Sequence, residues 1–114
     1  MKKNRGGDIK YKSYRFSIHI VQFLQTLSSK HLYNAIVKEL LSSSSSIGIY
    51  ISQAVFQLEK DIALKYFKKA LNNANKASYL LLLLRDSNFA KSKDIDNLII
   101  EITMIRRLLN KIIN

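Results

Sequence analysis

Four lysines at helical spacing are the residues of this chain that most directly suggest chemistry. They are Lys65, Lys68, Lys69 and Lys76. At 100° per residue they fall within about 100° of one another on a helix, opposite an apolar stripe. Ammonium groups in such a row bind phosphates as point charges and do not read bases, so the contact would be salt-sensitive and independent of sequence. The alternative is that the row is only a solvated helix face.

The first 12 residues carry many cations and almost no side chains to bury. We expect residues 1–12 to form a flexible basic arm. Together with Arg15, its cations complete the predicted nucleic-acid-binding set: Lys2, Lys3, Arg5, Lys10, Lys12 and Arg15. Tyr11, Tyr14 and Phe16 alternate with the last three of these, a pattern that could stack on unpaired bases. The alternative is an arm that only keeps the protein in solution.

The net charge of the whole chain favours the nucleic-acid interpretation of both features. The chain carries 19 Lys and Arg against 8 Asp and Glu, a net charge of +11. A field of that sign attracts polyanions and repels further copies of the same chain. The charge bears on partners and does not predict the fold.

Residues for catalysis or metal binding are sparse. His19 and His31 are the only histidines, the chain has no Cys, and no paired carboxylates flank either histidine at metal-ligand spacing. The serines at 42–46 have no base nearby in sequence, and Gly48 stands alone, so no phosphate-binding loop is predicted. We therefore expect no enzymatic activity, no cofactor and no bound metal.

The composition predicts long helices that would position these side chains. The chain has 114 residues, no Pro and only three Gly, which is typical of one domain of long helices joined by short turns. Apolar spacing predicts helices over about 14–27, 31–58, 59–85 and 92–113. Ser13 and Ser92 are the expected N-caps of the first and last helix. The expected fold is all-α, an antiparallel up-down-up-down four-helix bundle over residues 13–114.

The five consecutive serines at 42–46 allow two interpretations of the second helix. Low complexity would make them a flexible linker between two short helices. However, Leu40, Ile47 and Ile51 keep helical phase across the run, which a disordered linker has no reason to do. We therefore favour one long helix with a weak centre, since each Ser costs only about half a kcal/mol against Ala in a helix.

Some apolar residues are left over once each helix has one core stripe. They are Val37, Leu41, Ile49, Phe56, Leu71, Leu82 and Leu83. Exposed apolar patches usually mark contact surfaces, so we predict a homo-oligomer with the second and third helices at its interface. The alternative is a generous core with a few exposed leucines. The longest apolar run, Tyr79–Leu84, is too short to cross a membrane, and we expect a cytoplasmic protein.

The segment Ser45–Ala54, which reads SSIGIYISQA, resembles a family signature. It is similar to the SIGANIxEA motif of small four-helix-bundle proteins encoded in intervening sequences of bacterial large-subunit ribosomal RNA genes. Lys60–Ala63 and Ala70–Leu80 resemble the KDFxxK…ALKEANEAxYWL helix of that family, and Leu83–Ser87 fits the end of the same helix. The resemblance covers about residues 14–113.

This resemblance implies an antiparallel four-helix bundle that assembles as a ring-shaped homopentamer. The accessory variability protein of diversity-generating retroelements has the same fold, is strongly basic, works with a reverse transcriptase and is thought to contact nucleic acid. The resemblance therefore implies nucleic acid and a reverse transcriptase as partners of this bacterial type of protein. The molecular function of the intervening-sequence members is not established, so the resemblance to them implies no particular activity.

The chain departs from the family pattern mainly at charged positions. Tyr50 stands where the family usually has Asn, and Leu80 stands in place of its Trp. Neutral or basic residues replace its acidic positions: Ser52, Gln53, Asn73 and Lys76. These changes shift the surface toward positive charge, which strengthens the polyanion hypothesis.

Two functional hypotheses follow from the sequence. The first is a non-catalytic, oligomeric protein that binds RNA or DNA, as an accessory factor to a reverse transcriptase or another RNA-handling enzyme. The alternative is a structural or scaffolding oligomer that binds a protein partner through its exposed apolar surface. In that case the positive charge would serve solubility alone.

Overall fold

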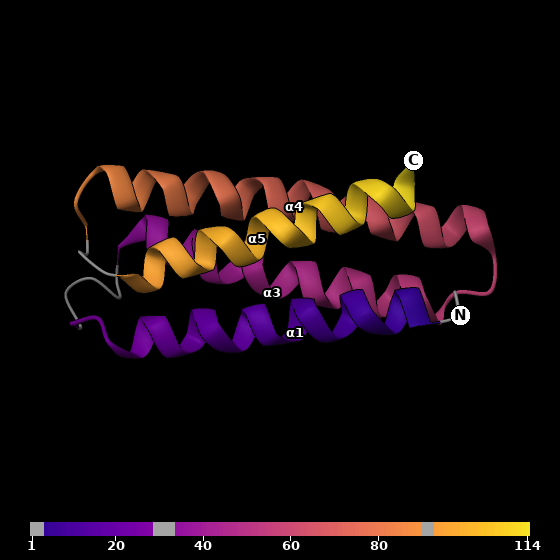
Figure 1. Ribbon diagram of the computed structural model, residues 1–114, viewed down its shortest axis with the longest axis horizontal. Helices are drawn as coiled ribbons and strands as arrows, with labels where there is room; N and C mark the ends of the chain where they lie inside the picture. The colour runs from indigo at the N-terminus through magenta and orange to yellow at the C-terminus, as the bar shows by residue number, and fades with distance from the viewer. Residues whose placement is uncertain (1–3, 29–33, 90–92) are drawn as a thin grey trace.

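Among the residues that the structure describes, four helices form a bundle. The computed structural model describes residues 4–28, 34–89 and 93–114. Its helices are α1 (Asn4–Gln25), α3 (Ala35–Phe56), α4 (Lys60–Asp86) and α5 (Lys93–Ile113). Successive helices run in opposite directions, and α5 returns to pack against α1 (Figure 1). The predicted all-α, antiparallel up-down-up-down bundle is therefore confirmed.

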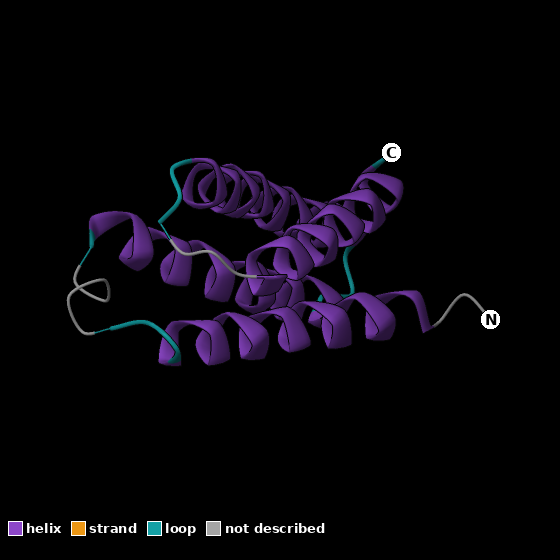
Figure 2. Cartoon of the chain, turned by 60° about the vertical axis from the view of Figure 1, so that its left-hand side comes forward, coloured by secondary structure: helices purple, strands orange, loops and turns teal. Residues whose placement is uncertain are grey.

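The bundle is elongated. It measures 44 × 22 × 20 Å, and none of the described residues forms a strand (Figure 2). Each helix packs against two neighbours, so that α1 contacts α3 and α5, and α4 contacts the same two helices from the other side. In consequence α1 and α4 lie diagonally across the core.

The first helix begins much earlier than the sequence predicts. It starts at Asn4 rather than near residue 14, so the prediction of a flexible arm over residues 1–12 is wrong for residues 4–12. The physical reason is Ile9, which is buried and in phase with Phe16 and Ile20 along the core side of α1. Ser13 is likewise not an N-cap, because its buried hydroxyl donates to the carbonyl of Lys10 at 3.0 Å within the helix.

The serine run lies inside α3, as the phase argument predicts. Residues 42–46 are helical throughout, and the flanking Leu40 and Ile47 are both fully buried. Ser43 and Ser44 are buried with them, where their small side chains leave room for neighbouring helices. Ser43 Oγ donates to the Leu40 carbonyl at 3.2 Å, so its hydroxyl is satisfied within the helix.

The apolar stripe that the sequence places opposite the four lysines is also confirmed, and it forms the core side of α4. Ala70, Ala74 and Ala77 are fully buried, as are Leu81 and Leu84 further along the same face. Because alanines are short, the backbone of α4 can approach its neighbours closely along this stretch. The opposite face of α4 is thereby held toward solvent.

The ends of the helices show how the sequence stops them. Asn34 caps α3, its side-chain oxygen accepting a hydrogen bond from the Ile36 amide at 2.7 Å. After α4, Asn88 adopts a left-handed conformation with φ of 58°, and the Phe89 amide donates back to the Leu84 carbonyl at 3.1 Å. Leu58, which continues the apolar spacing of α3 in the sequence, lies fully exposed in the turn.

Four of the residues discussed above lie outside the described part of the chain: Lys2, Lys3, His31 and Ser92. Among the described helices none is long and apolar enough to cross a membrane.

Asp94 and Asp96 lie in the first turn of α5, where carboxylates suit the positive end of the helix dipole.

Candidate nucleic-acid interface

The α4 lysine surface consists of Lys65, Lys68, Lys69 and Lys76, all of them exposed. Their side chains leave the helix on the side opposite the buried alanines. The first lysine and the last are eleven positions apart in the sequence, a span of about 16 Å at about 1.5 Å per residue. A row of that length can reach a few neighbouring phosphates and no more.

Two tyrosines hold Lys69 in place. Its ammonium nitrogen lies 5.6 Å from the ring centre of Tyr50 on α3 and 5.9 Å from that of Tyr66 on α4. The two rings are stacked with their centres 6.3 Å apart. Cation–π contacts of this kind keep the charge on the ammonium while restricting where it can go. Lys69 is therefore a positioned cation.

Besides Lys69, two further cations of α4 form ion pairs with carboxylates of the same subunit. Lys76 Nζ donates to Glu39 Oε1 at 3.4 Å, an exposed ion pair of the kind that contributes little to stability. Arg85 Nε donates to Asp86 at 2.8 Å, and this hydrogen bond raises the pKa of Arg85 above its ordinary value. A bound phosphate would therefore compete with Glu39 for Lys76.

The α1 basic cluster consists of Lys10, Tyr11, Lys12, Tyr14 and Arg15. Tyr11 and Tyr14 are 59% and 65% exposed. The guanidinium carbon of Arg15 lies 5.7 Å from the ring centre of Tyr11, and Lys12 lies 4.0 Å from an oxygen of Asp8. Both tyrosines are thus available at the surface beside cations.

The other residues predicted for this end of the chain do not all join the cluster. Phe16 is fully buried in the core, so the suggestion that it stacks on bases is wrong. Arg5 lies in the first turn of α1.

The structure does not bring the α4 lysine surface and the α1 basic cluster together. Because α1 and α4 are diagonal in the bundle, their outward faces point in opposite directions (Figure 1). One subunit therefore has two separate positive surfaces rather than one continuous groove.

The apolar residues predicted for an oligomer interface divide into three groups. Val37 is only 2% exposed and packs in the core of its own subunit, so its assignment to an interface is wrong. Leu71 and Leu82 are half-buried. The remaining four are exposed: Leu41, Ile49, Phe56 and Leu83. The leucine run of α4 is thus mostly covered within the subunit, and most of the exposed apolar side chains in this set belong to α3.

Several exposed apolar residues were not predicted from the sequence. Ile18 and Val21 continue the outward face of α1 beyond the tyrosines, and Tyr79 is exposed on α4. Their exposure follows from the helical wheels of α1 and α4, so the same phase argument could have identified them. The Tyr50–Tyr66 pair joins two helices, and no local pattern in the sequence predicts it.

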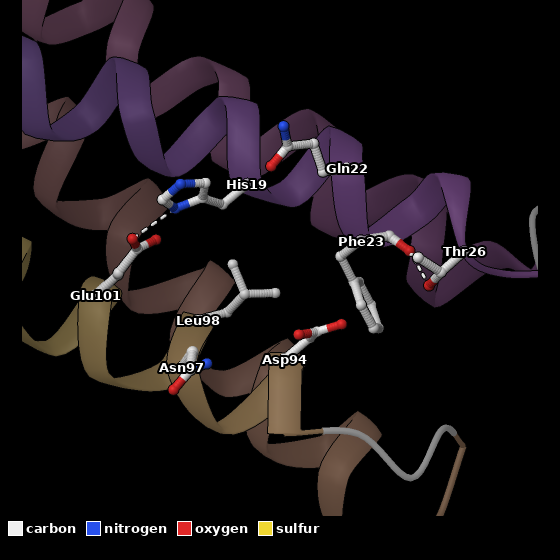
Figure 3. Close-up of a pocket in the computed structure, with 8 residues that line it drawn as sticks. All are labelled: His19, Gln22, Phe23, Thr26, Asp94, Asn97, Leu98 and Glu101. Atoms are coloured by element: carbon white, nitrogen blue, oxygen red, sulfur yellow. Dashed lines mark hydrogen bonds and ion pairs between the residues drawn. The ribbon is translucent and has the colours of Figure 1, made fainter.

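A pocket of about 380 Å³ lies between α1 and α5 (Figure 3). At one end His19 Nδ1 and Glu101 Oε2 are 2.6 Å apart and share a hydrogen bond. The hydroxyl of Thr26 donates to the Phe23 carbonyl, so it is not held as an activated nucleophile. Among the residues that the structure describes, no three His, Cys, Asp or Glu side chains gather as a metal-binding group.

Comparison with known proteins relates the fold to one family. No protein-family model and no curated protein matches the chain. A crystal structure of a protein of unknown function from the S23 ribosomal protein family of Bacteroides thetaiotaomicron VPI-5482 superposes with a TM-score of 0.86. The two share 27% sequence identity, over 96% of this chain and 97% of the other. Over almost its whole length the chain is thus similar, in fold and in sequence, to an all-helical protein of that family.

Proposed function

We propose that this chain is a non-catalytic protein that binds RNA or DNA through its phosphates and works as a homo-oligomer. The observation that carries this proposal is the net charge of +11, combined with the outward placement of the α4 lysine surface and the α1 basic cluster. Exposed lysines attract a polyanion and release its counterions on binding. Because lysines act as point charges, the binding would be largely independent of sequence.

The cellular partners belong to the same proposal. The sequence resemblance supports a ring-shaped homopentamer and an accessory role beside a reverse transcriptase or another RNA-handling enzyme in the cytoplasm. Assembly would multiply the positive surfaces, and the mutual repulsion of the subunits would be relieved by a bound polyanion.

The test is to titrate labelled RNA and DNA at increasing salt with two matched variants. The first replaces the α4 lysine surface by glutamine: Lys65→Gln, Lys68→Gln, Lys69→Gln and Lys76→Gln. The control replaces four exposed cations elsewhere: Lys60→Gln, Lys93→Gln, Arg107→Gln and Lys111→Gln. Each variant loses four positive charges, so the net charge falls from +11 to 11 − 4 = +7 in both.

The two variants should separate local contact from general charge. If all four lysines contact phosphates, the first variant should lower the slope of log K against log salt by about 3, at about 0.7–0.9 per contact. The control variant should change the slope much less. Absence of binding by the unmodified protein at low salt, or binding indifferent to salt, would contradict the proposal.

A second candidate function is a scaffolding oligomer that binds protein. It is favoured by the exposed apolar side chains of α3, above all Phe56, which is 86% exposed, and Ile49. If these residues form a subunit contact, Ile49→Ser with Phe56→Ser should reduce the mass measured by light scattering. Ile100→Ser, at an exposed position of α5 outside the predicted interface, is the control. An unchanged mass in all variants would remove the support for this candidate.

A further inference from the structure

The outward face of α1 separates into an aromatic, basic half and an aliphatic half. Tyr11 and Tyr14 lie in the first half, among the cations of the α1 basic cluster. Ile18 and Val21 continue the same face, yet residues 16–25 contain no Lys, Arg, Asp or Glu. Tyrosines set among cations are the combination that base stacking beside phosphate contacts requires.

Arg15 links the two kinds of group. The carbon of its guanidinium lies over the Tyr11 ring, 5.7 Å from the ring centre, and the Tyr11 side chain remains exposed to solvent. Guanidinium groups stack on aromatic rings and bind phosphate oxygens with their remaining N–H groups. Arg15 is therefore placed beside the phosphate of a nucleotide whose base would lie on Tyr11.

A groove between α1 and α3 lies next to Tyr14. Its volume is about 360 Å³, and Tyr14, Lys10 and Ile49 line it together with serines and Gly48. Since Gly48 has no side chain, the nearest serine hydroxyls would lie 3.9 Å from a methyl group there, and the wall of the groove stays open. A flat ring can therefore enter beside the Tyr14 ring, with Lys10 at the edge of the groove.

The hydroxyl groups of this groove are poorly suited to reading a base. Ser13 donates to the Lys10 carbonyl at 3.0 Å and Ser45 to the Leu41 carbonyl at 2.9 Å. Ser17 makes a longer contact of 3.4 Å with the Ser44 carbonyl. Three of the four serines that line the groove are engaged in this way, and Ser52 is the fourth. The groove therefore offers mainly apolar contact and stacking, with few free donors for a specific pattern. Recognition there would tolerate any base.

We infer that the α1 basic cluster and the adjoining groove bind an unpaired nucleic-acid strand, one base on Tyr11 and a neighbouring base on Tyr14, with Lys10 and Arg15 at the phosphates. The inference rests on the proposed function and names its substrate class. Side chains three apart on a helix have Cβ atoms about 5–6 Å apart, so the two rings can serve successive nucleotides. In a duplex the bases are stacked on each other and cannot reach either ring.

The experiment compares four labelled probes of about twelve nucleotides, within the usual range of single-strand site sizes. They are oligo(U), oligo(dT), a duplex of the same length and an abasic strand that keeps only the phosphates. The test variant is Tyr11→Leu with Tyr14→Leu, which keeps the surface apolar. The control is Tyr11→Phe with Tyr14→Phe, which keeps both rings. Circular dichroism and light scattering on each variant test whether its fold and its mass match those of the unmodified protein.

Stacking on two rings predicts that the leucine variant binds oligo(U) and oligo(dT), the single strands that carry bases, at least about thirtyfold more weakly than the unmodified protein does. The phenylalanine variant should bind nearly as the unmodified protein does. The duplex, the abasic strand and the salt slope should be unaffected by either variant. A loss with oligo(U), oligo(dT) or both supports the inference.

The remaining outcomes overturn it. In one of them the leucine variant binds every probe as tightly as the unmodified protein does, with the same dependence on salt. That result would refute the stacking site and leave the proposed function intact. An equal loss with duplex and abasic strands would assign the tyrosines a role other than stacking. A changed mass with unchanged affinity would assign them to a subunit contact. Lack of binding to every probe by the unmodified protein would instead refute the proposed function itself.

Discussion

Replacing Ser44 by alanine should stabilise the protein. Its side chain is 1% exposed, and its hydroxyl oxygen has no hydrogen-bond partner among the described residues. Ser43 is the matched control in the same serine run, because it is equally buried but donates to the Leu40 carbonyl. The comparison isolates the effect of a satisfied hydroxyl from that of helix propensity.

The magnitude can be worked out from these two environments. Alanine improves helix propensity by about 0.5 kcal/mol at either position. At Ser44 it also removes a buried polar atom without a partner, for a total gain of about 1–2 kcal/mol. At Ser43 the lost hydrogen bond costs about 0.5–1.5 kcal/mol, so the net change should lie within about 1 kcal/mol of zero.

The assay is thermal and urea unfolding of both variants at one fixed protein concentration, since any oligomer makes stability depend on concentration. For a chain of this length a gain of 1 kcal/mol corresponds to about 4 °C in Tm. Ser44→Ala should therefore melt about 4–8 °C higher than the unmodified protein. If Ser44→Ala is destabilising, or matches Ser43→Ala, the hydroxyl has a partner in solution and the reasoning fails.

Two further substitutions test the packing of the bundle. Gly48→Ala should raise the unfolding free energy by about 0.5–1 kcal/mol, because the position is helical and an added methyl would meet only Ser13 and Ser17 at 3.9 Å. Urea unfolding measures the change. A loss of stability would show that α1 and α3 lie too close together at this position to accept a methyl group. Leu81→Ala, at a fully buried position of α4, should cost about 2–5 kcal/mol, whereas Leu58→Ala, at a fully exposed position, should cost less than about 0.5 kcal/mol. Similar losses for both leucines in the same assay would contradict the assigned core.

The architecture was predictable because the apolar residues of this chain keep helical phase over long stretches. Leu40, Ile47 and Ile51 hold that phase across the serine run, which outweighs the low complexity of the run itself. The start of α1 was not predictable in the same way. Ile9 is a single apolar residue among charges and glycines, and only its burial against other helices shows that the helix includes it.

The candidate site was predictable in its residues but not in its contacts. The exposure of the α4 lysines follows from the alanines on the other face of the helix. The contacts of Lys69 with Tyr50 and of Lys76 with Glu39 join different helices, so no local spacing contains them. Val37 was misassigned for a related reason. Because α3 lies between α1 and α4, more of its circumference is covered than one stripe predicts.

The diagonal placement of α1 and α4 has a consequence for stoichiometry. The bundle is 22 × 20 Å across, more than twice the screening length of about 8 Å at physiological salt, so a strand held on one side would scarcely alter affinity on the other. A single subunit would then be bivalent and could tether two separate nucleic-acid molecules. Mixtures near charge equivalence would become turbid through cross-linking, and an excess of either component would clear them.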